Sequence, residues 1–280
     1  MYIIFGCDEI GNALARNLSR AGDETLIIDN SETVFVGLKE PNLRTITTNI
    51  HTLDFSSLPM KDTIAFILLQ KTSQDNLMIA NRIKKLFPDK FVLSRATDEI
   101  EAAELLENGV DRTVQIARIV THAILDELET AKLKTSVFHL VSVIQEAAGK
   151  GVAIFLQDNP DPDAIASGCA LKRIAEKYHI KSTIYYGGNI GRQQNKILVD
   201  LLETDLIQLK TADEALEIAH AADKVALIEA SIPSKNNILP LQITPHIVID
   251  HHETDFSLVK GEFIEILPKI GATSTILTRY

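Results

Sequence analysis

The chain has 280 residues, of which 45% are hydrophobic and 24% are charged, and 28 lysines and arginines against 38 aspartates and glutamates give a net charge of −10. This composition is that of a folded globular protein and excludes a disordered or fibrous chain. The length predicts two domains, each large enough to bury a hydrophobic core. The negative charge argues against binding of long duplex DNA or RNA through a broad basic face.

Neither a membrane protein nor a secreted disulfide-rich protein is indicated. No apolar run reaches the roughly 20 residues that a transmembrane helix needs, and the N-terminus lacks the basic and apolar regions of a signal peptide. The two cysteines, Cys7 and Cys169, lie in different halves of the chain. These features predict a cytoplasmic protein that does not insert into a membrane.

The N-terminal segment predicts the opening unit of a dinucleotide-binding fold. An apolar strand over residues 1–6 ends in glycine, a helical pattern follows, and a second strand ends on Asp29. In this arrangement Gly6 permits the tight turn, Gly11 lets the helix pack close to the strand, and Asp29 would hold ribose hydroxyls. The fingerprint departs from G-x-G-x-x-G at one position, since Asp8 stands where the second glycine belongs.

The rest of the first half continues the alternation of strand and helix that is typical of a doubly wound parallel sheet. The strands are predicted over residues 63–69, 91–95 and 113–116, and the helices over residues 76–86 and 100–107. Residues 117–150 have a helical pattern throughout, which predicts a connector between two α/β domains.

This order of elements, together with the stretch KFVLSRATDEIEAAELLENGVDRTV, resembles the RCK or TrkA-N regulatory domains of potassium transport systems over residues 1–116. The resemblance implies a homodimer that binds NAD(H), AMP or ATP at the glycine-rich turn and has a peripheral link to a transport system. It implies a sensor or an assembly module rather than a catalytic centre. Because of Asp8, two alternatives stay open: a working nucleotide site, or a domain that has kept its packing glycine and lost its ligand.

Side chains that can bind metals follow three apolar segments of the second half, each predicted to be a buried strand. The carboxyl ends of parallel strands meet at one edge of a sheet, so these side chains are expected to form one cluster. Mixed carboxylate and imidazole ligands suit Mn²⁺ and, less specifically, Mg²⁺, Fe²⁺ or Zn²⁺. The strands and the residues that follow them are 152–156 with Asp161 and Asp163, 225–228 with Glu229, and 246–249 with Asp250, His251 and His252. For the two aspartates after the first strand, an acidic turn that caps a helix is the alternative.

Four features of the second half belong together: the motif NPDPDAIAS at residues 159–167, the strand-end Glu229, the DHH at residues 250–252 and GATST at residues 271–275. In this order they resemble the DHH phosphoesterase superfamily, in particular its nanoRNases and cyclic-dinucleotide phosphodiesterases. The resemblance covers residues 137–280. It implies manganese-dependent hydrolysis of small phosphate esters: short oligonucleotides, linear or cyclic dinucleotides, or 3′-phosphoadenosine 5′-phosphate.

Carried over position by position, the resemblance implies a site with two Mn²⁺ ions. The implied metal ligands are Asp161, Asp163, Glu229 and His251. Asp250 and His252 would orient the phosphate and support the neighbouring imidazole. Arg192 is a candidate phosphate contact, and an ordinary surface arginine is the alternative. We expect Asp163→Ala to lower metal affinity with little loss of fold.

Departures from the DHH pattern suggest that this two-metal site is incomplete. Gln157 stands where the family has a metal-binding histidine, and Glu229 stands where it has the shorter aspartate. The family's last metal-binding aspartate and its DHH-associated domain would lie beyond Tyr280, which suggests a truncated chain.

The expected fold class is α/β. A Rossmann-like doubly wound sheet is predicted over residues 1–116, a helical connector over residues 117–136, and a second α/β domain of DHH phosphoesterase type over residues 137–280. The main expectation for function is a manganese-dependent phosphodiesterase or phosphatase regulated by a nucleotide at the first domain. The alternative is a catalytically impaired ligand-sensing or interaction protein built on both scaffolds.

Overall fold

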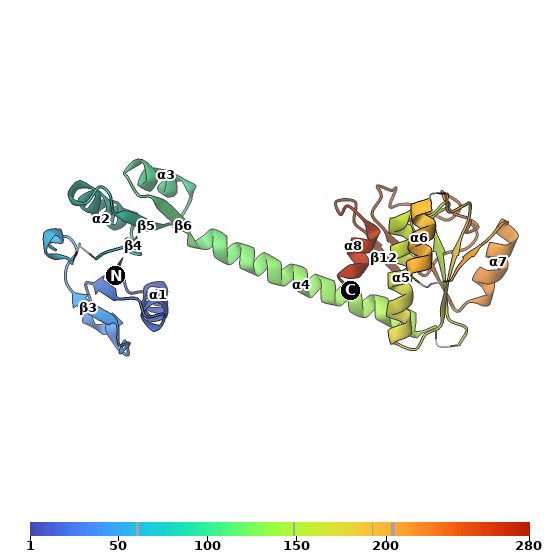
Figure 1. Cartoon of the computed structure of the whole chain (residues 1–280), viewed down its shortest axis with the longest axis horizontal. Coiled ribbons are helices and arrows are strands. Elements are labelled where there is room, and N and C mark those ends of the chain that lie inside the picture. Colours follow the sequence, from blue (N-terminus) through green and yellow to red (C-terminus); the bar gives the residue numbers. More distant parts are fainter. Residues whose placement is uncertain (60–61, 148, 192, 203–204) are drawn as a thin grey trace. The chain divides into compact units, whose positions relative to one another are not determined.

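The computed structural model describes the chain except for residues 60, 61, 148, 192, 203 and 204. The chain divides into two compact units, Met1–Asp126 and Glu127–Tyr280, and each is built on one parallel sheet with flanking helices (Figure 1). The predicted α/β fold class is therefore confirmed. The predicted domain limits at residues 116 and 137 stay predictions.

Within the described residues, six strands of the first unit form a sheet in the order β3-β2-β1-β4-β5-β6, and every neighbouring pair is parallel. The order reverses between β1 and β4, and this switch point is where open α/β sheets bind their ligands. The strands are β1 (Tyr2–Phe5), β2 (Thr25–Asp29), β3 (Leu43–Thr47), β4 (Ala65–Leu68), β5 (Phe91–Ala96) and β6 (Arg112–Gln115). The helices are α1 (Glu9–Arg20), α2 (Ser73–Leu86) and α3 (Glu99–Glu107), with short 3₁₀ turns at Glu32–Phe35 and Phe55–Ser57.

The core of this unit covers both faces of the sheet. Successive side chains of a strand point to opposite faces. In β1, Ile3 and Phe5 pack into the apolar cluster on one face, and Ile4 packs into the cluster on the other face. Because both faces are covered, the central strands are apolar along their length, and this run of apolar residues made them recognisable in the sequence.

The second unit repeats this topology. Its described strands form a parallel sheet in the order β12-β11-β10-β7-β8-β9, so that the order again reverses beside the first strand of the unit, between β7 and β10. The strands are β7 (Val152–Leu156), β8 (Ser182–Tyr186), β9 (Leu206–Gln208), β10 (Lys224–Ile228), β11 (Ile247–Asp250) and β12 (Phe263–Ile266). The helices are α5 (Pro162–Lys177), α6 (Gln193–Leu202), α7 (Ala212–Ala221) and α8 (Thr273–Thr278).

The three central strands of the second sheet end side by side. Ile228 of β10 pairs with Leu156 of β7 and with Ile249 of β11. The next residues along the three strands are Gln157, Glu229 and Asp250. The register thus brings one polar side chain from each strand to the same edge of the sheet, at its switch point.

A single helix, α4 (Ile116–Gln145), leads from the first unit into the second. The sequence pattern predicted a helix that continues to residue 150. Instead, the backbone amides of Gly149, Lys150 and Gly151 donate hydrogen bonds to the Asp223 carboxylate, so these residues belong to a turn. Among the described residues, no helix is both long enough and apolar enough to span a membrane.

Candidate functional site

The turn after β1 needs glycine at both predicted positions. Gly6 has a φ of +107°, and a Cβ atom added to it would lie 2.7 Å from the Leu69 carbonyl oxygen. A Cβ atom added to Gly11 would lie 2.1 Å from the carbonyl oxygen of Gly6. Since these neighbours are backbone atoms, neither contact can be relieved by turning a side chain. The two glycines therefore hold α1 against the switch point of the first sheet.

Asp29 ends β2 and contacts the same turn. Its Oδ2 accepts a hydrogen bond from the Cys7 backbone N–H at 2.8 Å, and its Oδ1 accepts one from the Ser31 backbone N–H at 3.1 Å. A carboxylate oxygen can accept two hydrogen bonds, so each oxygen keeps room for one further donor. The structure thus brings Gly6, Gly11 and Asp29 together, and Asp29 can accept hydroxyl hydrogen bonds from a ligand.

Asp8 is the N-cap of α1. Its Oδ1 accepts hydrogen bonds from the backbone N–H groups of Ile10 and Gly11, each at 3.1 Å. Its Oδ2 lies 2.9 Å from Nη1 of Arg95, a residue of β5 that stands 87 positions later in the chain. Asp is among the best N-cap residues, which explains why α1 forms here without the second glycine of the fingerprint. Arg95 was not predicted as a site residue, and its one signal in the sequence was a basic residue near the carboxyl end of a strand.

Cys7 lies inside this turn as a neutral thiol. Burial, with the nearby Asp29 and Asp8 carboxylates, raises its pKa to about 11. Its Sγ lies 3.5 Å from the carbonyl oxygen of Val34. The thiol therefore adds packing to the turn and carries no charge at neutral pH.

In the second unit, Glu229 is one of two buried acids at the switch point, the other being Asp250. It follows β10 directly, is only 3% exposed, and has a φ of +61°, an unusual value for a residue other than glycine. Its Oε2 is buried and has no hydrogen-bond partner among the described residues. Burial, with the nearby Asp163 and Asp250 carboxylates, raises its pKa to about 7, although the nearby Thr273 side chain opposes this rise.

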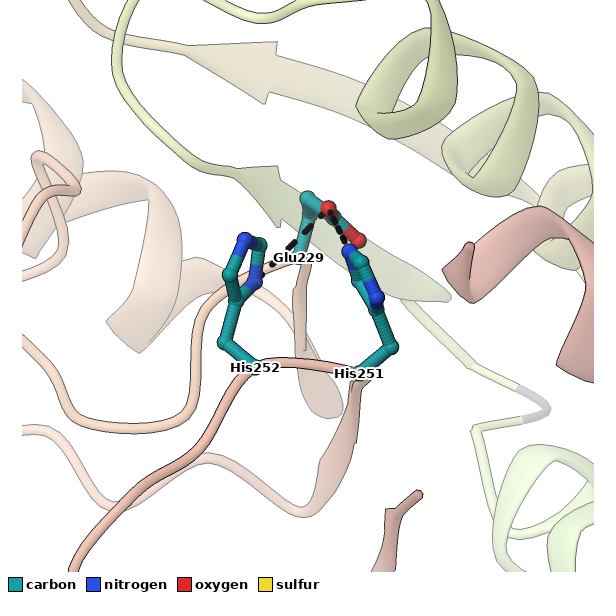
Figure 2. Close-up of side chains that lie close together, drawn as sticks. All are labelled: Glu229, His251 and His252. Atoms are coloured by element: carbon teal, nitrogen blue, oxygen red, sulfur yellow. Dashed lines mark ion pairs between the residues drawn. The ribbon is translucent and has the colours of Figure 1, made fainter. Parts of the chain in front are cut away.

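Two histidines from the loop after β11 point toward the Glu229 carboxylate (Figure 2). Glu229 Oε1 lies 3.1 Å from Nε2 of His251 and 3.7 Å from Nδ1 of His252. These three residues can each place one ligand atom within 4.8 Å of the others. The structure therefore brings together Glu229, His251 and His252, as expected for strand ends at one edge.

The hydrogen bonds of the two histidines give them different roles. His251 Nδ1 lies 3.1 Å from the Ile270 carbonyl oxygen, which can only accept, so Nδ1 carries a proton. The other ring nitrogen, Nε2, is the atom that faces Glu229. His252 Nδ1 instead lies 2.8 Å from Oδ1 of buried Asp250. Burial opposes the charged ring, but this hydrogen bond raises the pKa of His252.

The acidic turn after β7 supplies helix caps. Asp161 caps α5, since its Oδ1 accepts a hydrogen bond from the Ala164 backbone N–H at 2.9 Å. Asp163 reaches α8, where it accepts hydrogen bonds from the backbone N–H groups of Thr273 at 2.7 Å and Ser274 at 2.9 Å. Burial opposes its ionisation, yet these hydrogen bonds lower the pKa of Asp163. Its Oδ2 is 3.9 Å from His251 Nε2, so Asp163 borders the cluster while capping α8.

A cavity of about 130 Å³ opens beside this cluster. Gln157 lines it, and the Gln157 Oε1 accepts a hydrogen bond from the Asn236 side chain at 3.0 Å. Lys235 and Ser231 also line it, and neither could be predicted from the sequence because both lie in an irregular loop. The last predicted site residue, Arg192, lies outside the described residues.

The family comparison concerns the first unit, and the match to a curated relative is longer than that unit. Residues 2–116 match the family model of the TrkA-N domain, which confirms that part of the predicted resemblance. An uncharacterized protein of Methanocaldococcus jannaschii is 31% identical over 229 residues, a stretch that covers 76% of this chain and 45% of that protein. The chain thus spans less than half the length of this curated relative.

Several solved structures resemble the chain at low identity. The NAD(P)-binding domain of an exopolyphosphatase-related protein from Archaeoglobus fulgidus is 23% identical, with 46% of this chain and 97% of that chain covered and a TM-score of 0.41. The TrkA-N domain of the inner membrane protein ybaL from Escherichia coli is 20% identical. The match covers 45% of this chain and 95% of that chain, with a TM-score of 0.40. The AMP-bound Kef C-terminal domain from Shewanella denitrificans is 15% identical. The match covers 72% of this chain and 97% of that chain, with a TM-score of 0.36.

These findings correct the main functional expectation. They support a TrkA-N regulatory domain and give no support for a DHH phosphoesterase domain or for Mn²⁺, so the expectation of a manganese-dependent phosphodiesterase is wrong. The geometry offers a physical reason. Among the described residues, the close metal-competent group contains Glu229 and two histidines but neither Asp161 nor Asp163, which cap helices. The alternative, a ligand-sensing protein, fits the findings better.

Proposed function

We propose that the chain is a nucleotide-sensing protein whose TrkA-N unit binds NAD(H), AMP or ATP at the turn between Gly6 and Gly11. The observation that carries the proposal is the position of Asp29 at the end of β2, next to β1 and the turn that follows it. Its contact with the Cys7 amide holds it against the turn, and its two oxygens each keep room for one hydroxyl donor. Ribose presents two adjacent hydroxyls, which match these two free acceptor positions.

Equilibrium dialysis of the full chain against each nucleotide tests this proposal. Asp29→Asn keeps the size of the side chain but replaces one acceptor oxygen with a donor, so we expect about tenfold weaker binding. Asp89→Asn is the matched control, because Asp89 is exposed and precedes β5 at the opposite edge of the sheet. Equal binding by wild type and Asp29→Asn would contradict the proposed ribose contact.

A second binding function is favoured by one specific observation, the unpartnered Oε2 of buried Glu229. We propose that the cluster in the second unit holds a divalent cation. Glu229 and His251 would hold it, and Asp163, 3.9 Å from His251 Nε2, borders it. Buried Asp250 positions the loop, because it accepts hydrogen bonds from the backbone N–H groups of His251 and His252. A bound cation would neutralise a carboxylate that is otherwise costly to bury.

The orientation of His251 supports the same proposal. With Nδ1 donating to the Ile270 carbonyl, Nε2 is the nitrogen that faces Glu229 Oε1, at 3.1 Å. Two acceptors this close repel each other unless a proton or a cation lies between them. Imidazole nitrogen and carboxylate oxygen together suit Zn²⁺, Fe²⁺ or Mn²⁺.

Calorimetric titration with Zn²⁺ and with Mn²⁺ tests the cation site separately from the nucleotide site. Removing the charge in Glu229→Gln should weaken binding about tenfold or more. His220→Asn is the matched control for a histidine change at His251, since His220 is exposed on α7. Unchanged affinity in both Glu229→Gln and His251→Asn would contradict the site.

We further propose that the chain forms a homodimer through α4. Its N-terminal half exposes large apolar side chains one turn apart, including Ile119, Val120 and Ile124, each at least half exposed. Such a stripe is costly in water and suits a helix-to-helix contact between two copies. The peripheral link to a transport system stays a prediction.

A further inference from the structure

The N-terminus of α1 is the place where a nucleotide phosphate would bind in the proposed site, and the Asp8 carboxylate already lies there. Helix N-termini attract anions because their first N–H groups have no partner within the helix. Here the N–H groups of Ile10 and Gly11 both donate to Asp8 Oδ1 at 3.1 Å. The chain thus supplies its own anion at this position.

Arg95 completes the environment of that anion. Its Nη1 lies 2.9 Å from Asp8 Oδ2, and both side chains are largely buried, at 24% and 21% exposure. A guanidinium carries five N–H donors in a planar fork that suits carboxylate and phosphate equally well. Helix amides and an arginine around one anion form the kind of environment that phosphates occupy in proteins.

We propose that Asp8 is an internal competitor of the nucleotide phosphate, and that Arg95 is the cation for which the two compete. This inference rests on the proposed nucleotide function. A phosphate placed on Arg95 and the α1 amides would meet the Asp8 carboxylate at contact distance, and two like charges so close repel. Nucleotide binding therefore requires Asp8 to leave Arg95, which lowers affinity for phosphate-bearing ligands and leaves affinity for the nucleoside nearly unchanged.

Asp8→Asn separates this role from helix capping. Asn and Asp are equally good N-cap residues, so the variant keeps α1 and removes only the charge. The double variant Asp8→Asn/Arg95→Gln also removes the cation. Both variants are compared with wild type by thermal melting before binding is measured, and Asp89→Asn serves as a charge-matched control.

Calorimetric titration of the full chain with AMP and with adenosine tests the inference. We expect Asp8→Asn to bind AMP about tenfold more tightly than wild type, whereas adenosine affinity changes by less than about threefold. The double variant should lose the gain for AMP, because the gain needs Arg95. Binding of AMP by Asp8→Asn but not by wild type would be the strongest form of the expected result.

Three results would overturn the inference, and they are distinguishable. If wild type and Asp8→Asn bind AMP equally well, Asp8 is a helix cap alone and the proposed nucleotide function still stands. If neither wild type nor any variant binds AMP or adenosine, the proposed nucleotide function is wrong, and so is the proposed competition by Asp8. An equal increase in affinity for AMP and for adenosine in Asp8→Asn would also overturn the inference, since adenosine carries no phosphate.

Discussion

The Asp163 carboxylate lies 2.7 Å from the backbone amide of Thr273, which stands 110 residues later in the chain. This hydrogen bond ties the start of α5 to the start of α8, and a second one reaches Ser274 at 2.9 Å. The residue at the N-cap of α8, Ala272, has no side chain that could cap the helix. A residue predicted from its motif to bind metal therefore also holds two distant segments together.

Asp163→Ala should destabilise the second unit, contrary to the expectation that the fold would change little. Loss of a partly buried carboxylate that accepts two amide hydrogen bonds costs about 2–3 kcal/mol. Urea denaturation measures this change, with Asp213→Asn at an exposed position of α7 as the control. Asp163→Asn keeps one acceptor oxygen and should recover part of the loss. If Asp163→Ala unfolds at the same urea concentration as wild type, the cap contributes nothing to stability.

Gly11→Ala should destabilise the first unit although alanine is the better helix former. The intrinsic preference favours alanine by about 1 kcal/mol, but the added Cβ would lie 2.1 Å from the Gly6 carbonyl oxygen. Forcing α1 away from β1 should cost more than this gain, for a net loss of about 2 kcal/mol. Thermal melting checks the prediction, which is a lower melting temperature for Gly11→Ala than for wild type. Gly271→Ala is the control, since nothing lies within 4 Å of a Cβ added there. A higher melting temperature for Gly11→Ala would show that the close contact is relieved at little cost.

Cys7 should react slowly with iodoacetamide in the folded protein at pH 8. Burial raises its pKa to about 11 from the ordinary value of 9.0, so little thiolate is present. Because the folded state favours the neutral thiol, this group's contribution to stability is present below pH 9 and is lost as the pH rises toward 11. Mass spectrometry of the alkylated peptide follows the reaction, with urea-unfolded chain as the fast reference. Equal rates in both states would show that the thiol is accessible.

Substitution of the apolar stripe on α4 tests the proposed homodimer. Val120→Glu combined with Ile124→Glu places two charges one turn apart on the exposed face, and we expect the variant to be monomeric. Light scattering coupled to size-exclusion chromatography gives the mass of wild type and variant. Arg118→Glu is the control for charge, since Arg118 precedes the same stripe on an exposed part of α4. A monomeric wild type would contradict the proposal, and so would a dimeric variant.

The strands and the convergence of their ends were predictable from the sequence because they follow from local rules. Long apolar runs identify buried parallel strands, and the carboxyl ends of such strands share one edge. For this reason Glu229 and Asp250 could be placed near each other although 20 residues separate them. Gly6 and Gly11 were recognisable for a similar reason, since their spacing alone fixes a turn before a helix.

The partners of individual carboxylates were not predictable, since they depend on contacts between distant segments. Asp8 could be recognised as a departure from the glycine fingerprint, but its pairing with Arg95 crosses 87 positions. The motif around Asp163 indicated a metal ligand, and the hydrogen bonds to α8 that compete for its oxygens lie 110 and 111 positions away. The motif resemblance thus led to a phosphodiesterase that the comparisons do not support.

The most direct test of nucleotide sensing is isothermal titration calorimetry of the full chain with AMP, ATP and NAD(H). At least one of these ligands should bind with a stoichiometry of one per chain, and Asp29→Asn should weaken the binding while Asp89→Asn leaves it unchanged. Absence of binding heat for all of them, in wild type and in Asp8→Asn, would contradict the proposed function of the first unit.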